Sequence, residues 1–120
     1  EVVNPDMPCT LDAAALVQMN RRNQIKGCII DGPLALDNAL SVEAAKHKGI
    51  VSEVAGSPDI LLVPDIEAGN LLGKVILFMA NGAGAGVVLG AKVPVVLTSR
   101  GDTARTKALS IALGAVLAKN

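Results

Sequence analysis

Residues 93–103, VPVVLTSRGDT, form the stretch on which the predicted fold depends. A short apolar run stops before a polar turn, and a helical pattern then opens at Thr103. Strands of open α/β sheets present their chemistry at the carboxyl end, where the chain turns into the next helix. This turn would therefore present the hydroxyl of Ser99, the guanidinium of Arg100 and the carboxylate of Asp102.

These side chains suit the binding of an anion. The fork of Arg100 matches a pair of phosphate or carboxylate oxygens, and the N–H groups that open the next helix would add to the same site. A plainer interpretation stays open, because helix capping is common: Asp102 or Thr103 caps the helix and Arg100 is a solvated surface charge.

Helices and strands alternate along the rest of the chain. The patterns predict helices over 10–22, 41–48, 69–80 and 103–119, and strands over 26–31, 60–63, 85–89 and 93–97. Thr10 or Asp12 is the expected cap of the first helix, and Ser41 that of the second. Strands that are apolar on both faces favour a three-layer α/β/α fold with a largely parallel sheet, in a single domain over residues 1–120.

Polar residues follow three of these strands. Asp31, Gly32 and Pro33 follow the first, Pro64 and Asp65 the second, and residues 99–102 the last. Right-handed crossovers would place all the carboxyl ends along one edge of the sheet. The sequence therefore predicts a cleft lined by these turns.

Composition excludes several classes of protein. Eleven basic residues balance eleven acidic ones, and with one Phe and no Trp or Tyr the chain lacks the features of a nucleic-acid binder. No apolar run reaches the ~20 residues that span a bilayer. Cys9 and Cys28 lack metal-ligand spacing, so a reducing cytoplasm is the expected setting, with Cys28 a buried thiol. His47, the only histidine, is expected at the surface, and no metal site is predicted.

The glycines of residues 82–86 do not form a nucleotide-binding loop. Neither GxGxxG nor GxxxxGK[ST] is present, and the run precedes a predicted strand instead of following one. A helix C-cap followed by a turn is the preferred interpretation.

Three ordered motifs, DGPLALDNA (31–39), PDIEAGN (64–70) with Lys74, and LTSRGD (97–102), resemble the carboxyl-terminal part of the phosphate acetyl/butyryltransferases. The resemblance extends over nearly the whole chain and is nearer to the butyryl branch. It implies a fold similar to that of the isocitrate and isopropylmalate dehydrogenases, in a longer enzyme of two domains. The start at Glu1, without Met, fits the expectation that an amino-terminal portion is missing.

The implied activity is reversible transfer of a short acyl group between coenzyme A and inorganic phosphate, both being substrates, with acyl phosphate as product and no cofactor. The expected catalytic residues are Ser99, Arg100 and Asp102. Those expected to bind substrate are Asp31, Gly32, Pro33, Asp65, Gly69, Asn70 and Lys74, with Gly69 and Asn70 opening their helix.

The sequence leaves four questions open. Asp102 and Asp31 are both candidates for the general base, because Thr106 stands where the acetyl branch has an acid. The apolar last helix indicates a homo-oligomer or cover from absent parts of the chain. A catalytically silent module that binds coenzyme A or mediates oligomerisation is the alternative function, and the acyl preference is not determined.

Overall fold

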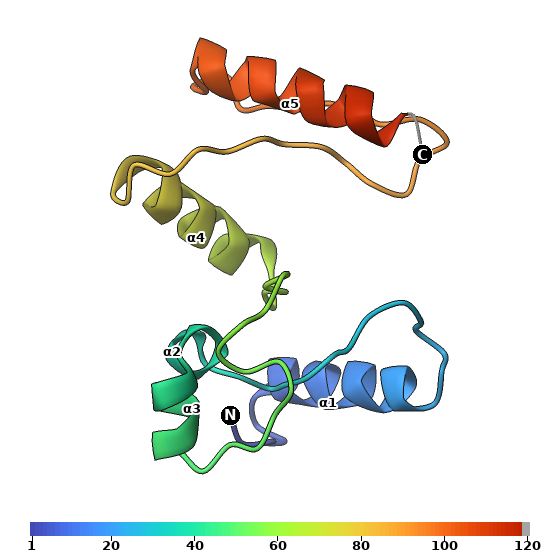
Figure 1. Cartoon of the computed structure of the whole chain (residues 1–120), viewed down its shortest axis with the longest axis vertical. Helices are drawn as coiled ribbons and strands as arrows, with labels where there is room; N and C mark the ends of the chain where they lie inside the picture. Colours follow the sequence, from blue (N-terminus) through green and yellow to red (C-terminus); the bar gives the residue numbers. More distant parts are fainter. Residues whose placement is uncertain (119–120) are drawn as a thin grey trace. The chain divides into compact units, whose positions relative to one another are not determined.

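The computed structural model describes residues 1–118, in which the chain forms five helices (Figure 1). These are α1 (Pro8–Arg21), α2 (Leu36–Leu40), α3 (Val42–His47), α4 (Ile66–Phe78) and α5 (Ala104–Leu117). The chain divides into two compact units, Glu1–Pro64 and Asp65–Asn120. The first unit holds α1, α2 and α3, and the second holds α4 and α5.

The predicted parallel sheet is absent from residues 1–118, so the α/β/α class is wrong for this structure. The only β-pairing there is one antiparallel bridge, in which the N–H of Val88 donates to the carbonyl oxygen of Val95 over 2.8 Å. The predicted strands over 26–31 and 60–63 form no bridge at all. A strand exists through its ladder of inter-strand hydrogen bonds, and apolar sequence alone does not provide one.

A side chain takes the place of a ladder beside segment 26–31. The amide of Asn20, near the end of α1, donates to the carbonyl oxygens of Ile25 and Cys28, each over 3.0 Å. Its oxygen accepts the N–H of Ile30 over 3.1 Å. Because these backbone groups are satisfied by Asn20, the segment stays irregular, and Cys28 is exposed where a buried thiol was predicted.

The start of α1 also differs from the prediction. The helix begins at Pro8, two residues before the predicted start, with Met7 as its N-cap and neither Thr10 nor Asp12 in that role. Proline suits this first position because its missing N–H has no partner there anyway. The buried hydroxyl of Thr10 instead binds inside the first turn, where it lies 2.8 Å from the carbonyl oxygen of Met7.

Helices α2 and α3 pack against each other. The prediction of Ser41 as the cap of the second helix is confirmed, because its hydroxyl accepts the N–H of Ala44 over 3.2 Å. Helix α2 was not predicted. Ala39 and Ala45 are buried, and with Val17 of α1 they complete the buried apolar residues among those described.

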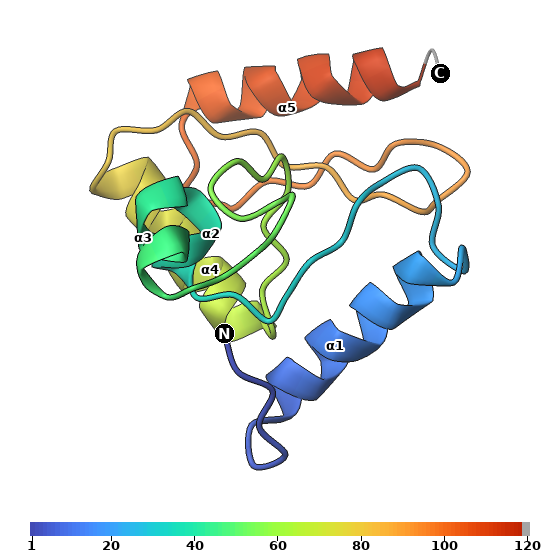
Figure 2. The same ribbon diagram turned by 60° about the horizontal axis from the view of Figure 1, so that its bottom comes forward.

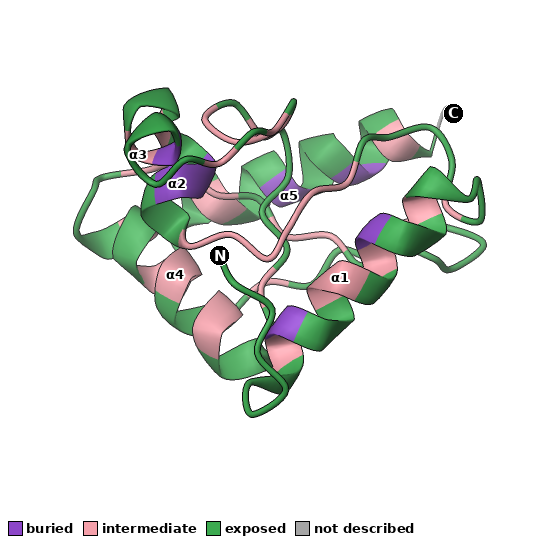
Figure 3. Ribbon diagram, turned by 90° about the horizontal axis from the view of Figure 1, so that it is seen from below, coloured by how far each residue is buried: buried purple, intermediate pink, exposed green. Residues whose placement is uncertain are grey.

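In the second unit the two helices expose most of their apolar side chains. Helix α4 begins at Ile66, three residues earlier than predicted, and none of its residues is buried. Helix α5 begins as predicted after Thr103, whose hydroxyl accepts the N–H of Thr106 over 3.2 Å. Its predicted end at residue 119 lies outside the described residues. The buried positions of α5 are Ser110 and Gly114 (purple in Figure 3).

Residues 82–97 run out and back beside α5 (orange in Figure 2). A Cβ atom built on Gly114 would lie 2.6 Å from the side chain of Val96, so the helix approaches this segment at a glycine. The hydroxyl of Ser110 accepts the N–H of Gly86 over 2.9 Å. Small residues thus join α5 to the segment at closer range than aliphatic side chains would allow.

Candidate functional site

The turn that links the last extended segment to α5 is closed by Asp102. The N–H of Ser99 donates to Asp102 Oδ2 over 2.8 Å, and the N–H of Asp102 donates to the carbonyl oxygen of Ser99 over 3.1 Å. Thr103, the next residue, caps the helix. Of the two capping alternatives left open above, the structure selects Thr103, and the carboxylate of Asp102 serves the turn.

Arg100 is exposed in this turn. Within residues 1–118, no carboxylate lies within ion-pair distance of its guanidinium group. An exposed guanidinium with all its N–H donors uncommitted to a carboxylate is suited to an anionic ligand.

One face of α4 lies opposite the turn within the second unit. Gly69, Asn70, Gly73, Lys74 and Leu77 recur at the spacing that aligns residues on one side of a helix. Asp65 caps the helix from outside this face, because its Oδ1 accepts the N–H of Ala68 over 2.8 Å. The expectation that Gly69 and Asn70 open the helix is therefore wrong, since both lie inside it.

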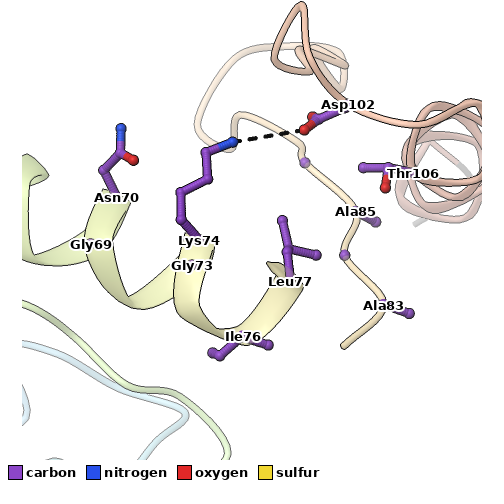
Figure 4. Close-up of a pocket in the computed structure, with 12 residues that line it drawn as sticks. Gly69, Asn70, Gly73, Lys74, Ile76, Leu77, Ala83, Ala85, Asp102 and Thr106 are labelled. Carbon is purple, nitrogen blue, oxygen red and sulfur yellow. Dashed lines mark ion pairs between the residues drawn. The ribbon is translucent and has the colours of Figure 1, made fainter. Parts of the chain in front are cut away.

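Between this face and the start of α5 lies a groove of about 400 Å³ (Figure 4). Three parts of the second unit form its walls. They are the face of α4, the segment 83–86, and the side chains of Asp102 and Thr106. Four of the lining residues are glycines, at positions 69, 73, 84 and 86.

Lys74 spans the groove toward Asp102 (Figure 4). Its Nζ lies 3.9 Å from Asp102 Oδ1 and 5.6 Å from the centre of the Phe78 ring. The side chain of Lys74 is 43% exposed, whereas that of Asp102 is 12% exposed. The largely covered carboxylate of Asp102 therefore has a cation nearby, and that cation also faces solvent.

The structure brings some of the predicted site residues together in the second unit. Gly69, Asn70, Lys74 and Asp102 line the groove, and Ser99 and Arg100 belong to the turn that Asp102 closes. Asp31, Gly32 and Pro33 belong to the first unit, where Asp31 Oδ1 accepts the N–H of Gly32 over 2.9 Å. Because no sheet forms in the described residues, the prediction that three strand ends share one edge is wrong.

Sequence reasoning missed the glycine wall of the groove. Residues 82–86 were predicted to be a helix cap and turn, but they pack closely against their neighbours. A Cβ atom on Gly84 would lie 2.7 Å from Leu77 Cδ2, and one on Gly86 would lie 2.7 Å from the carbonyl oxygen of Leu97. Gly73, Leu77 and Thr106 were also missed as lining residues. The first two share a face with Asn70 by their spacing of three and seven residues, which is the signal that could have found them.

The titratable groups give no sign of a metal centre. Among the described residues, no group of three or more His, Cys, Asp and Glu side chains is arranged to hold a metal ion. The two cysteines are free, and His47 is exposed, as predicted. Residues 1–118 also contain no helix with the length and apolar character that crossing a bilayer requires.

Comparison with known proteins identifies a family. A family model described as Phosphate acetyl/butaryl transferase matches residues 1–115. The phosphate acetyltransferase of Thermotoga maritima is 63% identical over 118 residues, which cover 98% of this chain and 40% of that protein. The phosphate butyryltransferase of Clostridium acetobutylicum is 56% identical over 120 residues, which cover 100% of this chain and 40% of that protein.

A solved structure is also similar. The crystal structure of a branched-chain phosphotransacylase from Enterococcus faecalis superposes with a TM-score of 0.82 at 38% identity, covering 96% of this chain and 41% of that chain. The chain thus spans about 40% of the length of the relatives it matches. Relatives named for acetyl, butyryl and branched-chain groups are all similar to this chain.

Proposed function

Because the chain belongs to the phosphate acetyl/butyryltransferase family, we propose that it contributes to reversible transfer of a short acyl group between coenzyme A and inorganic phosphate. A phosphate oxygen attacks the thioester carbonyl carbon, the bond from carbon to sulfur breaks, and acyl phosphate and coenzyme A result. The observation that carries this proposal is family membership over nearly the whole chain, together with a groove lined by Lys74 and Asp102.

The Ser99–Asp102 turn supports a specific division of roles. Attack on the thioester places negative charge on the carbonyl oxygen, and preorganised donors stabilise such an oxyanion. The hydroxyl of Ser99 is suited to that donation, and the guanidinium of Arg100 is suited to holding inorganic phosphate or a phosphate of coenzyme A. Both residues are exposed in the structure and hence accessible to a ligand.

Asn70, with Gly69, is proposed to bind substrate from the face of α4, and Lys74 to support substrate binding through its charge. Their support is their position in the groove, where Lys74 lies beside the carboxylate of Asp102. Asp65, which caps the start of the same helix, is also proposed to bind substrate. Asp31, Gly32 and Pro33 are proposed to bind substrate from the first unit, with Asp31 as a candidate base for the thiol of coenzyme A in the reverse direction.

We place this activity in a longer enzyme of two domains in the cytoplasm, which assembles as a homo-oligomer. The coverage of 40% of the relatives supports a longer chain. Aliphatic side chains on α5, such as Ile111 and Val116, are exposed, which supports the proposal that the rest of the enzyme or a second copy covers this helix. Free thiols at Cys9 and Cys28 suit a reducing compartment.

The test is phosphate-dependent release of coenzyme A from butyryl-CoA and from acetyl-CoA. It is run on the full-length gene product and on the 120-residue chain in parallel. Release in the full-length protein that requires phosphate or arsenate is the expected result, and the preferred substrate gives the acyl length. Tight binding of coenzyme A without turnover in the full-length protein would instead establish the silent binding module.

A further inference from the structure

We propose that Asp102 is a positioning residue that holds the Ser99–Arg100 turn in its binding conformation, and that Lys74 neutralises its charge. This inference rests on the proposed function and assigns Asp102 a role other than that of general base. It comes from the contacts of one carboxylate, whose two oxygens face two different parts of the second unit.

The first part is the turn itself. Asp102 Oδ2 accepts the N–H of Ser99 over 2.8 Å, while the backbone N–H of Asp102 returns a bond to the carbonyl oxygen of Ser99. Two hydrogen bonds between the same two residues enclose Arg100 and Gly101. Nothing lies within 4 Å of the position that a Cβ atom on Gly101 would occupy, so no neighbour packs against that side of the turn. The carboxylate of Asp102 therefore determines where the Ser99 hydroxyl and the Arg100 guanidinium are presented.

The second part is α4. Asp102 Oδ1 faces Lys74 Nζ at 3.9 Å, across the groove wall. A carboxylate that is 12% exposed beside an anion site would repel phosphate unless a cation offset its charge. Lys74 supplies that cation, which leaves Arg100 as the uncompensated positive charge of the turn. Lys74 then assists phosphate indirectly, by neutralising Asp102.

The same contacts argue against Asp102 as the base. A general base must come within hydrogen-bond distance of the proton it removes, and its oxygen must be free to accept it. One oxygen of Asp102 is engaged by a backbone N–H, and the other faces an ammonium group. Protonation of either oxygen would weaken a contact that holds the turn.

Two substitutions at one position separate positioning from base chemistry. In the full-length gene product, Asp102→Asn keeps an oxygen that can accept the Ser99 N–H, whereas Asp102→Ala removes it. We expect Asp102→Ala to lower kcat on the order of 100-fold through misplacement of the turn, while Asp102→Asn stays within about tenfold of the parent. The acid limb of the pH–rate profile should persist in Asp102→Asn. Equal losses in both variants, with that limb abolished, would overturn the proposal in favour of a base.

A charge test addresses Lys74. Lys74→Met should raise the KM for phosphate about fivefold, because the Asp102 carboxylate is then unopposed. Adding Asp102→Asn to Lys74→Met should return the KM toward the parent value. A double variant no better than Lys74→Met would mean that Lys74 binds substrate directly, and that outcome would overturn the pairing. Lys92→Met and Asp59→Asn, both at exposed positions, are the matched controls.

A measurement without substrate keeps this inference distinct from the proposed function. Amide hydrogen exchange at Ser99 should accelerate about tenfold or more in Asp102→Ala and stay near the parent rate in Asp102→Asn. An unchanged rate in Asp102→Ala would overturn the positioning role of Asp102 even if the enzyme is active. A parent protein that releases no coenzyme A would refute the proposed function, while the exchange result would still decide whether Asp102 holds the turn.

Discussion

The two units of this chain are stabilised by different kinds of residue. In the first unit the buried side chains include the aliphatic groups of Val17, Ala39 and Ala45. In the described part of the second unit the buried positions are Ser110 and Gly114, and no aliphatic side chain is buried. Polar side chains bind irregular backbone in both units, through Asn20 in the first and Ser110 in the second.

This difference shows where the second unit is sensitive. Its segments approach one another at glycines, and its apolar side chains face outward, so its geometry depends on contacts that a single methyl group would disturb. The same glycines form a wall of the groove. Stability and site geometry are therefore coupled in the second unit.

The largest effect is expected from Gly86→Ala. The new Cβ atom would lie 2.7 Å from the carbonyl oxygen of Leu97, and a backbone atom cannot rotate away. We expect the free energy of unfolding to fall by about 3 kcal/mol, as overpacking in a tight site does. Urea denaturation of the variant beside the parent measures the loss. A midpoint equal to that of the parent would show that the structure accommodates the added methyl group beside Leu97.

Ser110→Ala should have the next largest effect. The hydroxyl of Ser110 accepts the N–H of Gly86 and donates to the carbonyl oxygen of Thr106 over 2.7 Å. Removing it leaves a part-buried N–H without its partner, at a cost of about 1–2 kcal/mol. Thermal unfolding of Ser110→Ala beside Ser57→Ala, at an exposed serine of the first unit, measures the difference. Equal midpoints for the two variants would contradict the role of Ser110.

Gly73→Ala should change stability in the opposite direction. Nothing lies within 4 Å of the position its Cβ atom would occupy, and the residue sits inside α4. Alanine favours a helix interior over glycine by about 1 kcal/mol, so the free energy of unfolding should rise by up to that amount. The same urea titration measures it. Destabilisation by Gly73→Ala would indicate a contact at this wall of the groove.

The smallest effect concerns an exposed ion pair of the first unit. The ammonium of Lys48 donates a hydrogen bond to Asp37 over 2.8 Å and lowers the pKa of that carboxyl, while the same bond raises the pKa of Lys48. A carboxyl with a depressed pKa in the folded state stabilises the fold above its unfolded value of 3.8, and this contribution is lost as pH falls below it.

Asp37→Asn should therefore lower the unfolding midpoint slightly near neutral pH and leave it unchanged well below pH 3.8. High salt should shrink the difference, because exposed pairs are screened. Thermal unfolding at two pH values measures this, with Asp59→Asn as the control at an exposed aspartate. A difference that persists in acid would mean that Asp37 acts through something other than its charge.

The sequence predicted local features well because they depend on nearby residues. Ser41 and Thr103 cap their helices through bonds to N–H groups three residues away, and the three motifs sufficed to identify the family. The start of α4 was placed three residues late, because Asp65 was interpreted as the end of a strand when it is the cap.

Long-range pairing was not predictable in the same way. The runs over 60–63 and 93–97 are as apolar as buried strands, but a strand also needs hydrogen-bond partners for its backbone groups. In the described residues the backbone of Ile30 binds Asn20, the N–H of Gly86 binds Ser110, and 93–97 forms a single bridge through Val95. The groove was only partly predicted for a related reason, since Gly84 and Gly86 reveal their role through neighbours distant in sequence.

The most direct test of this account is the kinetics of Arg100→Ala in the full-length gene product. Arg22→Ala, at the exposed end of α1, is the matched control. If the turn binds phosphate as proposed, kcat/KM for phosphate should fall on the order of 100-fold in Arg100→Ala, with the unfolding midpoint retained and the control near the parent value. Equal kcat/KM values for the two variants would contradict the assignment of the turn as the anion site.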